Sequence, residues 1–197
     1  MKNTILLTAL LLFGVIATAQ QKLPKNKQDI SESVEKHKND LISISDEIWA
    51  NAETAFEEYD SSKKLSDYAE ANGFSVEKGV AGMPTAFVAT YGEGKPVIGI
   101  LGEFDALPGI SQKAVPTKQA LEPGGAGHGC GHNLFGTASL GAAIAVKEMI
   151  QKGKIKGTIK FFGTPSEEKY FGKIWMVEAG LWDDVDVNLS WHPKAKT

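Results

Sequence analysis

An unbroken apolar run at Val97–Leu101 constrains the fold of this 197-residue chain more than any other feature. Neighbouring side chains of a strand point to opposite faces of its sheet, so a wholly apolar strand must be covered on both faces. The cover must come from other elements, and helical and strand patterns alternate along the rest of the chain. The sequence therefore predicts an α/β fold with three layers, in which helices lie on both faces of a central sheet.

Apolar spacing and turn residues place the remaining elements. Apolar residues recur at three-to-four spacing from Ile30 to Ile48, which predicts an amphipathic helix with His37 on its surface. We expect three further helices, over residues 62–72, 137–149 and 173–179. The other expected strands cover residues 74–77, 85–91, 157–163 and 185–191, and a long loop runs from 106 to 131.

The first nineteen residues have the pattern of a secretory signal peptide. Lys2 precedes a mostly apolar run of 13 residues over 5–17, and Ala17-Thr18-Ala19 supplies a small-residue cleavage site. A membrane anchor is the alternative, but the run is shorter than the ~20 residues that span a bilayer. We expect cleavage after Ala19, export to the periplasm or the medium without stable membrane insertion, and a linker over residues 20–28.

The charge and cysteine content limits the partners of the chain. Lys and Arg number 21 against 24 Asp and Glu, giving a net charge of −3, and all the cations are lysines. A weakly acidic chain without Arg is a poor candidate for binding nucleic acid. It also has no Arg to clamp a substrate carboxylate with two parallel hydrogen bonds. Its single cysteine, Cys130, excludes an internal disulfide.

Four polar clusters follow expected strands or close the long loop. They comprise Glu103 with Asp105, His128 with Cys130 and His132, Glu167 with Glu168, and His192. Ligands of open α/β sheets bind beyond the carboxyl ends of the strands, so we expect these side chains to meet. The same four clusters contain three of the four histidines of the chain.

The residue types in these clusters suit a transition metal. Thiolate, imidazole and carboxylate together favour zinc, although Mn and Co also accept imidazole and carboxylate. Cys130 and His132 are two residues apart, so in an extended segment both would point the same way. The alternative is a buried cysteine in a glycine-rich turn, and His192 alone could equally be a capping or core histidine.

The two adjacent glutamates are expected to have different tasks. Neighbouring side chains diverge, so one of Glu167 and Glu168 could bind metal while the other acts as general base. The alternative is a solvated acidic turn. Asp105 could orient a metal ligand from behind, or it could be a turn residue before Leu107-Pro108.

At these clusters the sequence resembles peptidase family M20, in its amidohydrolase subfamily. The segments are Gly-Glu-Phe-Asp-Ala-Leu-Pro at 102–108, Gly-His-Gly-Cys-Gly-His-Asn at 127–133, Gly-Thr-Pro-Ser-Glu-Glu at 163–168 and Ser-Trp-His-Pro at 190–193. The resemblance implies a zinc-peptidase-like sheet and hydrolysis of an amide next to an amino acid. Substrates would be p-aminobenzoyl-glutamate or N-acyl amino acids. A dipeptidase of the same family and a non-catalytic exported metal-binding fragment are the alternatives.

The resemblance also implies roles for individual residues. Two divalent ions, Zn or Mn, would be bound by a set of four ligands: Cys130, His132, Glu168 and His192. Glu167 would be the general base, and Asp105 would lie beside the metals. In the wider family a metal-binding His stands two residues before that Asp. Here the position holds Glu103, which we do not assign as a ligand.

The family pattern extends beyond this chain. In the family the catalytic domain is interrupted by a smaller lid and dimerisation domain, then resumes and supplies one more metal-binding His. We therefore expect residues 29–197 to correspond to the N-terminal part of the catalytic domain, truncated before the lid. The full-length form is expected to be a homodimer or a hetero-oligomer.

Overall fold

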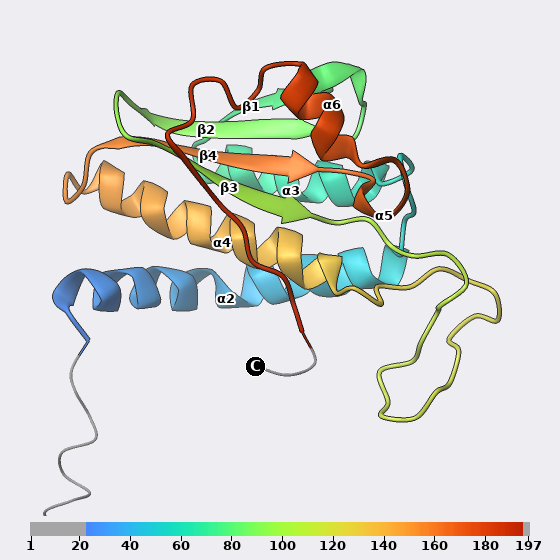
Figure 1. Ribbon diagram of the computed structural model, residues 1–197. Coiled ribbons are helices and arrows are strands. Elements are labelled where there is room, and N and C mark those ends of the chain that lie inside the picture. Colours follow the sequence, from blue (N-terminus) through green and yellow to red (C-terminus); the bar gives the residue numbers. More distant parts are fainter. Residues whose placement is uncertain (1–22, 195–197) are drawn as a thin grey trace, which may run out of the picture.

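The computed structural model describes residues 23–194 (Figure 1). The predicted signal peptide, residues 1–19, and the first three residues of the predicted linker lie outside the described residues. Between residues 23 and 194 no helix is long and apolar enough to cross a membrane.

The centre of the fold is a mixed sheet of five strands. In chain order they are β1 (Ser75–Lys78), β2 (Phe87–Glu93), β3 (Val97–Glu103), β4 (Gly157–Thr164) and β5 (Val187–Leu189), and in space they follow the order β1-β2-β4-β3-β5. β3 is parallel to β4 and β5, whereas β2 is antiparallel to both β1 and β4. All five predicted strands are present, but the strand predicted over 185–191 shrinks to three exposed residues.

Helices cover both faces of this sheet, as predicted (Figure 1). One face carries α2 (Lys25–Asn51), α3 (Tyr59–Ala71) and α4 (His132–Gln151); the other carries α6 (Gly172–Glu178) and the short 3-10 helix η1 (Val80–Gly82). The four-residue helix α5 (Glu167–Tyr170) follows β4. Fully buried side chains such as Phe161 and Leu140 join the sheet to the first layer, and Phe162 and Met176 join it to the second.

The first helix begins earlier than the sequence predicted. Residues 25–28, which we assigned to the linker, form the first turn of α2, and the carbonyl oxygen of Pro24 accepts hydrogen bonds from the backbone N–H groups of Lys27 and Gln28. The turn is fixed by Asp29, which forms ion pairs with Lys25 on the same helix and with Lys154 after α4. A polar composition indicated a linker, but charge pairing stabilises a helical turn instead.

The prediction of a surface position for His37 is wrong. Its side chain lies buried between α2, α3 and α4, with Nδ1 2.8 Å from the Tyr68 hydroxyl and Nε2 3.2 Å from Glu148 Oε1. Both partners come from other helices, 31 and 111 residues along the chain. The local pattern of α2 therefore could not show that this polar position is covered.

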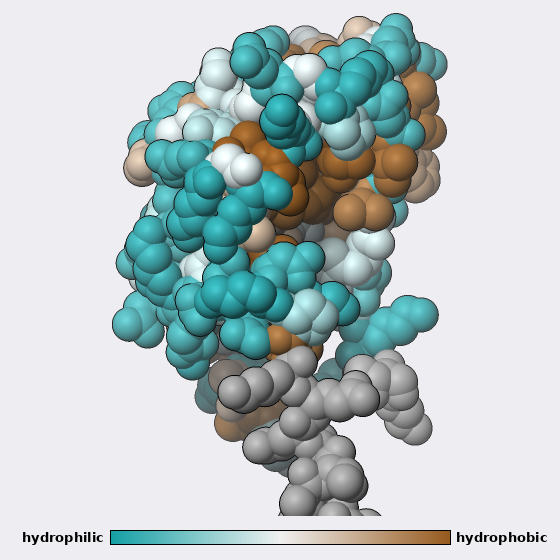
Figure 2. Space-filling view, turned by 90° about the vertical axis from the view of Figure 1, so that its left-hand side faces the viewer, coloured by the Kyte–Doolittle hydropathy of each residue, from teal (hydrophilic) through white to brown (hydrophobic). Residues whose placement is uncertain are grey.

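The strand order brings the predicted clusters to one edge of the sheet. β3 and β4 are parallel neighbours, with Glu103 paired to Thr164 at their carboxyl ends. α4 connects β3 to β4 over one face, and α6 lies on the other face in the connection from β4 to β5. The chain thus leaves β3 and β4 toward opposite faces, and ligands of open α/β sheets bind beside such a pair of carboxyl ends. Figure 2 views the opposite end of the molecule, where hydrophilic side chains cover the left side and a hydrophobic hollow extends toward the right.

Candidate metal centre

His132 is the centre of the predicted site and is completely buried. It is the first residue of α4, so Cys130 and His132 do not lie in the extended segment that we expected; a turn at Gly131, with φ 75°, separates them. Gly131 also packs closely against Pro193, because an added Cβ would stand 3.1 Å from the Pro193 side chain. Gly131 therefore allows α4 to begin at His132 and allows the segment that carries His192 to pack closely against it.

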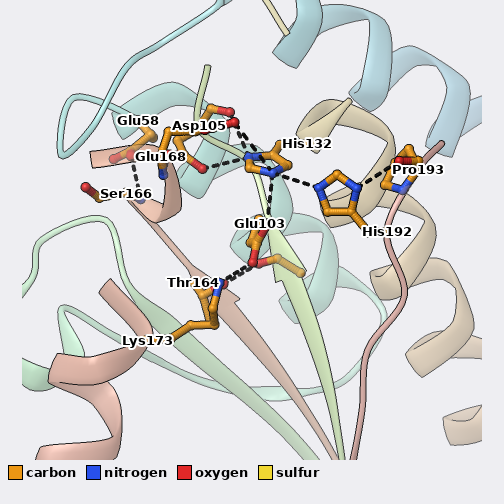
Figure 3. Close-up of polar contacts among 11 residues, drawn as sticks. Glu58, Glu103, Asp105, His132, Thr164, Ser166, Glu168, Lys173, His192 and Pro193 are labelled. Carbon is orange, nitrogen blue, oxygen red and sulfur yellow. Dashed lines mark hydrogen bonds and ion pairs between the residues drawn. The ribbon is translucent and has the colours of Figure 1, made fainter. Parts of the chain in front are cut away.

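The imidazole of His132 contacts carboxylates on both sides (Figure 3). Nδ1 lies 2.9 Å from Asp105 Oδ1 and 3.1 Å from the Asp105 carbonyl oxygen, while Nε2 lies 3.0 Å from Glu103 Oε2. Burial lowers the pKa of His132, but the hydrogen bonds to Asp105 and Glu103 outweigh it and raise the pKa to about 10. The position therefore stabilises positive charge strongly.

His192 approaches His132 from the segment after β5. Its Nε2 lies 3.3 Å from Nε2 of His132, and its Nδ1 lies 2.8 Å from the carbonyl oxygen of Pro193. A carbonyl oxygen can only accept, so the hydrogen-bond network assigns the proton to Nδ1 and leaves a lone pair on Nε2 of His192. Orientation of an imidazole by an oxygen at its far nitrogen is the usual arrangement of a metal-binding histidine.

Two overlapping groups of side chains have ligand atoms within 4.8 Å of one another. The first is Cys130, His132 and His192, and the second is Glu103, His132 and Glu167. His132 belongs to both groups. The structure thus brings together predicted residues from all four polar clusters.

Asp105 connects His132 to the glutamate pair. Its Oδ1 faces His132, and its Oδ2 accepts a hydrogen bond of 2.9 Å from the backbone N–H of Glu168. Glu168 Oε1 lies 4.0 Å from His132 Nε2 and, among the described residues, is buried without a hydrogen-bond partner. A buried carboxylate oxygen without a hydrogen-bond donor, close to an imidazole nitrogen, fits a cation ligand.

The remaining ionisable groups of the site reflect its excess of carboxylates. Burial and the nearby Glu103 carboxylate raise the pKa of Glu167. The hydrogen bond with Glu168, together with burial, raises the pKa of the Cys130 thiol to about 11. A divalent cation reverses this effect, because it stabilises the thiolate and the carboxylates together. The residues present therefore fit a metal centre.

Sequence reasoning missed three residues at this edge. Glu103 was named but not assigned, and its buried carboxylate lies between His132 and Lys173. Burial raises the pKa of Glu103, but the hydrogen bonds from these two partners outweigh it and leave the pKa lowered. Lys173, on α6, carried no motif that could have indicated its role. The same is true of Glu58, whose carboxylate reaches the turn before Glu167 (Figure 3).

The model of the peptidase family M20/M25/M40 matches residues 99–196, the part of the chain that contains every residue of this centre described above except Glu58. The chain belongs to this family. The M20 resemblance seen in the four motifs is thereby confirmed.

Curated relatives and solved structures agree with the M20 assignment. The chain is 47% identical over 169 residues to one of the subunits of p-aminobenzoyl-glutamate hydrolase from Escherichia coli (strain K12), an alignment that covers 84% of this chain and 35% of that protein. It is 28% identical to the Xaa-Arg dipeptidase of Mus musculus, over 91% of this chain and 40% of that protein. A dinuclear metal-binding M20 peptidase from Bacillus subtilis has a TM-score of 0.71 and 26% identity, over 82% of this chain and 44% of that chain. The chain thus spans less than half the length of each of these relatives.

Proposed function

We propose that this chain forms the metal-binding and proton-transfer part of an amidohydrolase that cleaves an amide bond next to an amino acid. The observation that carries the proposal is the convergence of Cys130, His132 and His192, whose ligand atoms lie within 4.8 Å of one another. Beside them, 4.0 Å from His132 Nε2, lies a carboxylate oxygen of Glu168 that has no hydrogen-bond partner among the described residues. Thiol, imidazole and carboxylate groups with their ligand atoms this close together are the donor set that zinc takes in proteins.

The proposed centre takes two divalent ions, Zn or Mn, with Cys130, His132, Glu168 and His192 as ligands. A dinuclear metal-binding relative supports the number of ions. When bound, such ions polarise the amide carbonyl and make water more acidic. Asp105 fixes the orientation of His132 from Nδ1 and positions Glu168 through its backbone N–H.

Glu167 is proposed as the general base. It takes a proton from the attacking water and delivers that proton to the nitrogen of the departing amine, so no proton is gained or lost. Its raised pKa suits this task, because a carboxylate with a higher pKa holds the proton better between the two transfers. Burial beside Glu103 is the cause of that shift.

The substrate class is proposed from the relatives. One of them is named for p-aminobenzoyl-glutamate and another for Xaa-Arg dipeptides. We favour p-aminobenzoyl-glutamate or an N-acyl amino acid, because the relative with 47% identity is named for hydrolysis of the former. That relative is also named as one subunit of its hydrolase, which supports a hetero-oligomer for the complete protein, and the signal-peptide pattern supports export.

The test is an assay of the protein that carries this sequence, loaded with Zn²⁺ or Mn²⁺. p-Aminobenzoyl-glutamate, an N-acyl amino acid and an Xaa-Arg dipeptide are supplied separately. We expect metal-dependent release of the free amino acid or amine, abolished by a chelator and restored by metal. Metal binding without turnover on any of the three substrates would support the non-catalytic alternative instead.

A further inference from the structure

A short segment that contributes no candidate metal ligand braces the glutamate pair from behind. This brace, residues 53–58, runs between α2 and α3. The backbone N–H of Ala106 donates a hydrogen bond of 2.8 Å to the carbonyl oxygen of Glu53, and Thr54 pairs with Ala106 in an isolated bridge. The brace is therefore attached to the residue that follows Asp105.

The other end of the brace contacts α5. The ring of Phe56 stacks on the ring of Tyr170, with centroids 5.3 Å apart and planes inclined by 6°. Phe56 has a positive φ of 61°, in the left-handed region that residues other than glycine rarely adopt. Such backbone strain persists where surrounding contacts enforce it, often at functional sites.

Glu58 makes the contact nearest to the glutamate pair. Its carboxylate is completely buried, with Oε1 accepting a 2.9 Å hydrogen bond from the backbone N–H of Ser166 and Oε2 accepting a 3.1 Å hydrogen bond from Thr85. Ser166 precedes Glu167 and is itself buried with a positive φ of 57°. The turn that presents the glutamate pair is thus held by two carboxylates: Glu58 at the N–H of Ser166 and Asp105 at the N–H of Glu168.

We propose that Glu58 is a positioning residue of the metal centre, which sets the direction of Glu167 and Glu168 through the Ser166 backbone N–H. This inference rests on the proposed function, because it assumes that Glu168 binds metal. Without the acceptor at Glu58, the left-handed turn at Ser166 loses a buried hydrogen bond, and the two glutamates following it are free to move apart from His132.

The electrostatics of the brace agree with a functional rather than a stabilising role. Burial, followed by the nearby carboxylate of Asp105, raises the pKa of Glu58 to about 7. A buried carboxylate near that of Asp105 opposes folding at neutral pH, and a neutral side chain of equal size would fill the same volume. A residue that lowers the stability of the fold, as the buried Glu58 carboxylate does, is typical of a functional site.

The test compares substitutions of Glu58 that are matched in size. Glu58→Gln keeps an oxygen that can accept from Ser166, whereas Glu58→Met fills the same space without an acceptor. Glu58→Asp retains the carboxylate, but its side chain is shorter by one methylene group, so the carboxylate no longer reaches the Ser166 N–H. Each full chain is freed of metal and titrated with Co²⁺, and absorption spectra report separately on the thiolate of Cys130 and on the geometry around the ion.

We expect Glu58→Gln to bind Co²⁺ with an affinity close to that of the unsubstituted chain. Glu58→Met and Glu58→Asp should bind about 10–100-fold more weakly, as is usual when a partner behind a metal ligand is lost. Their ligand-field bands should change while the thiolate-to-cobalt band persists, because Glu168 is displaced and Cys130 is not. The two substitutions differ in charge and size, so a folding failure of one leaves the other as the test.

Ile144→Ala is the matched structural control. Ile144 is buried in the core cluster between α4 and the sheet, which contains neither Glu58, Ser166 nor a candidate ligand. We expect its substitution to lower stability and to leave the hydrogen bond between Glu58 and Ser166 in place. Unchanged Co²⁺ affinity and spectrum in both Glu58→Met and Glu58→Asp would overturn the inference alone. An equal loss of affinity in Ile144→Ala would also overturn it. If the unsubstituted chain did not bind Co²⁺, the proposed metal centre itself would be wrong, and the role of Glu58 would fall with it.

Discussion

His37 and His132 are both buried histidines beside carboxylates, yet their surroundings differ in charge. Around His37, the carboxylate of Glu148 also receives Lys36 at 2.9 Å and Lys152 at 3.3 Å. Burial raises the pKa of Glu148, but hydrogen bonds from Lys36, His37 and Lys152 outweigh it and bring the pKa to about 2. This cluster is neutralised by its own lysines.

Around His132 the balance is reversed. The imidazole faces Glu103 and Asp105, with Glu168 next to them, and Lys173 is the lysine that the described residues place on this cluster by an ion pair. One oxygen of Glu168 is unpartnered within residues 23–194. The difference teaches that a buried histidine beside a carboxylate does not itself mark a metal site. What favours a metal site around His132 is an excess of carboxylates over cations, together with a carboxylate oxygen that has no hydrogen-bond donor.

The largest expected effect concerns the two members of the glutamate pair. In the protein that carries this chain, Glu167→Gln should retain metal but lower turnover by roughly 10²–10⁴-fold, the usual contribution of a general base. Glu168→Gln should instead lower metal affinity. Metal content by atomic emission and turnover at saturating metal separate the two roles, and identical behaviour of both variants would refute the division.

The next effect distinguishes the metal centre from the His37 cluster directly. Cys130→Ser should weaken metal binding by more than about 100-fold, since loss of a ligand exceeds the 10–100-fold that loss of a supporting partner costs. His37→Asn should leave the binding isotherm unchanged. Equal stoichiometry and affinity in Cys130→Ser and the unsubstituted chain would remove Cys130 from the ligand set.

The pH dependence of stability should differ between the two regions. The pKa of Glu58 is raised from 4.5 to about 7, so its contribution is fully present below pH 4.5 and is lost as the pH rises through 7. In the metal-free chain, the unfolding free energy of the unsubstituted chain relative to Glu58→Gln should fall by up to about 3 kcal/mol between pH 4.5 and 8. Urea denaturation across this range measures the difference.

Glu148→Gln is the control for that titration. The pKa of Glu148 is lowered to about 2, so its contribution is present above about pH 4.5 and is lost only as the pH falls toward 2. In a His37→Asn background, which removes the titratable imidazole beside Glu148, the stability difference caused by Glu148→Gln should therefore stay constant between pH 5.5 and 8. A pH-dependent difference there, or a constant one for Glu58→Gln, would contradict the contrast between the regions.

The smallest expected effect is at His37 itself. His37→Asn cannot reach both Tyr68 and Glu148, so a buried hydrogen bond is lost and unfolding free energy should fall by about 1–2 kcal/mol. Denaturant unfolding of the metal-free chain measures this loss. No change in stability would mean that the cluster is already satisfied without the imidazole.

The spacing of apolar and polar residues along the chain was enough to predict the layers of the fold and the edge of the sheet where the site lies. The apolar run of β3 and the alternation of helical and strand patterns predicted the three layers. Because the polar clusters follow the strand ends, the location of the site followed from the same pattern. Four ordered motifs then identified the family. The long-range partners were not predictable. Glu58 meets Ser166 from 108 residues away, and Lys173 meets Glu103 from 70 residues away, with no spacing rule to connect them.

The three-residue strand β5 has a consequence for the order in which the site assembles. Its side chains are exposed, and the segment that follows carries His192 to His132. Few buried contacts secure this end of the sheet, so it belongs among the first segments to open in the native state. A cation bound at both imidazoles would close that opening. Cation binding at the centre should therefore increase the amide-exchange protection of β5, because the same closed state is required for both.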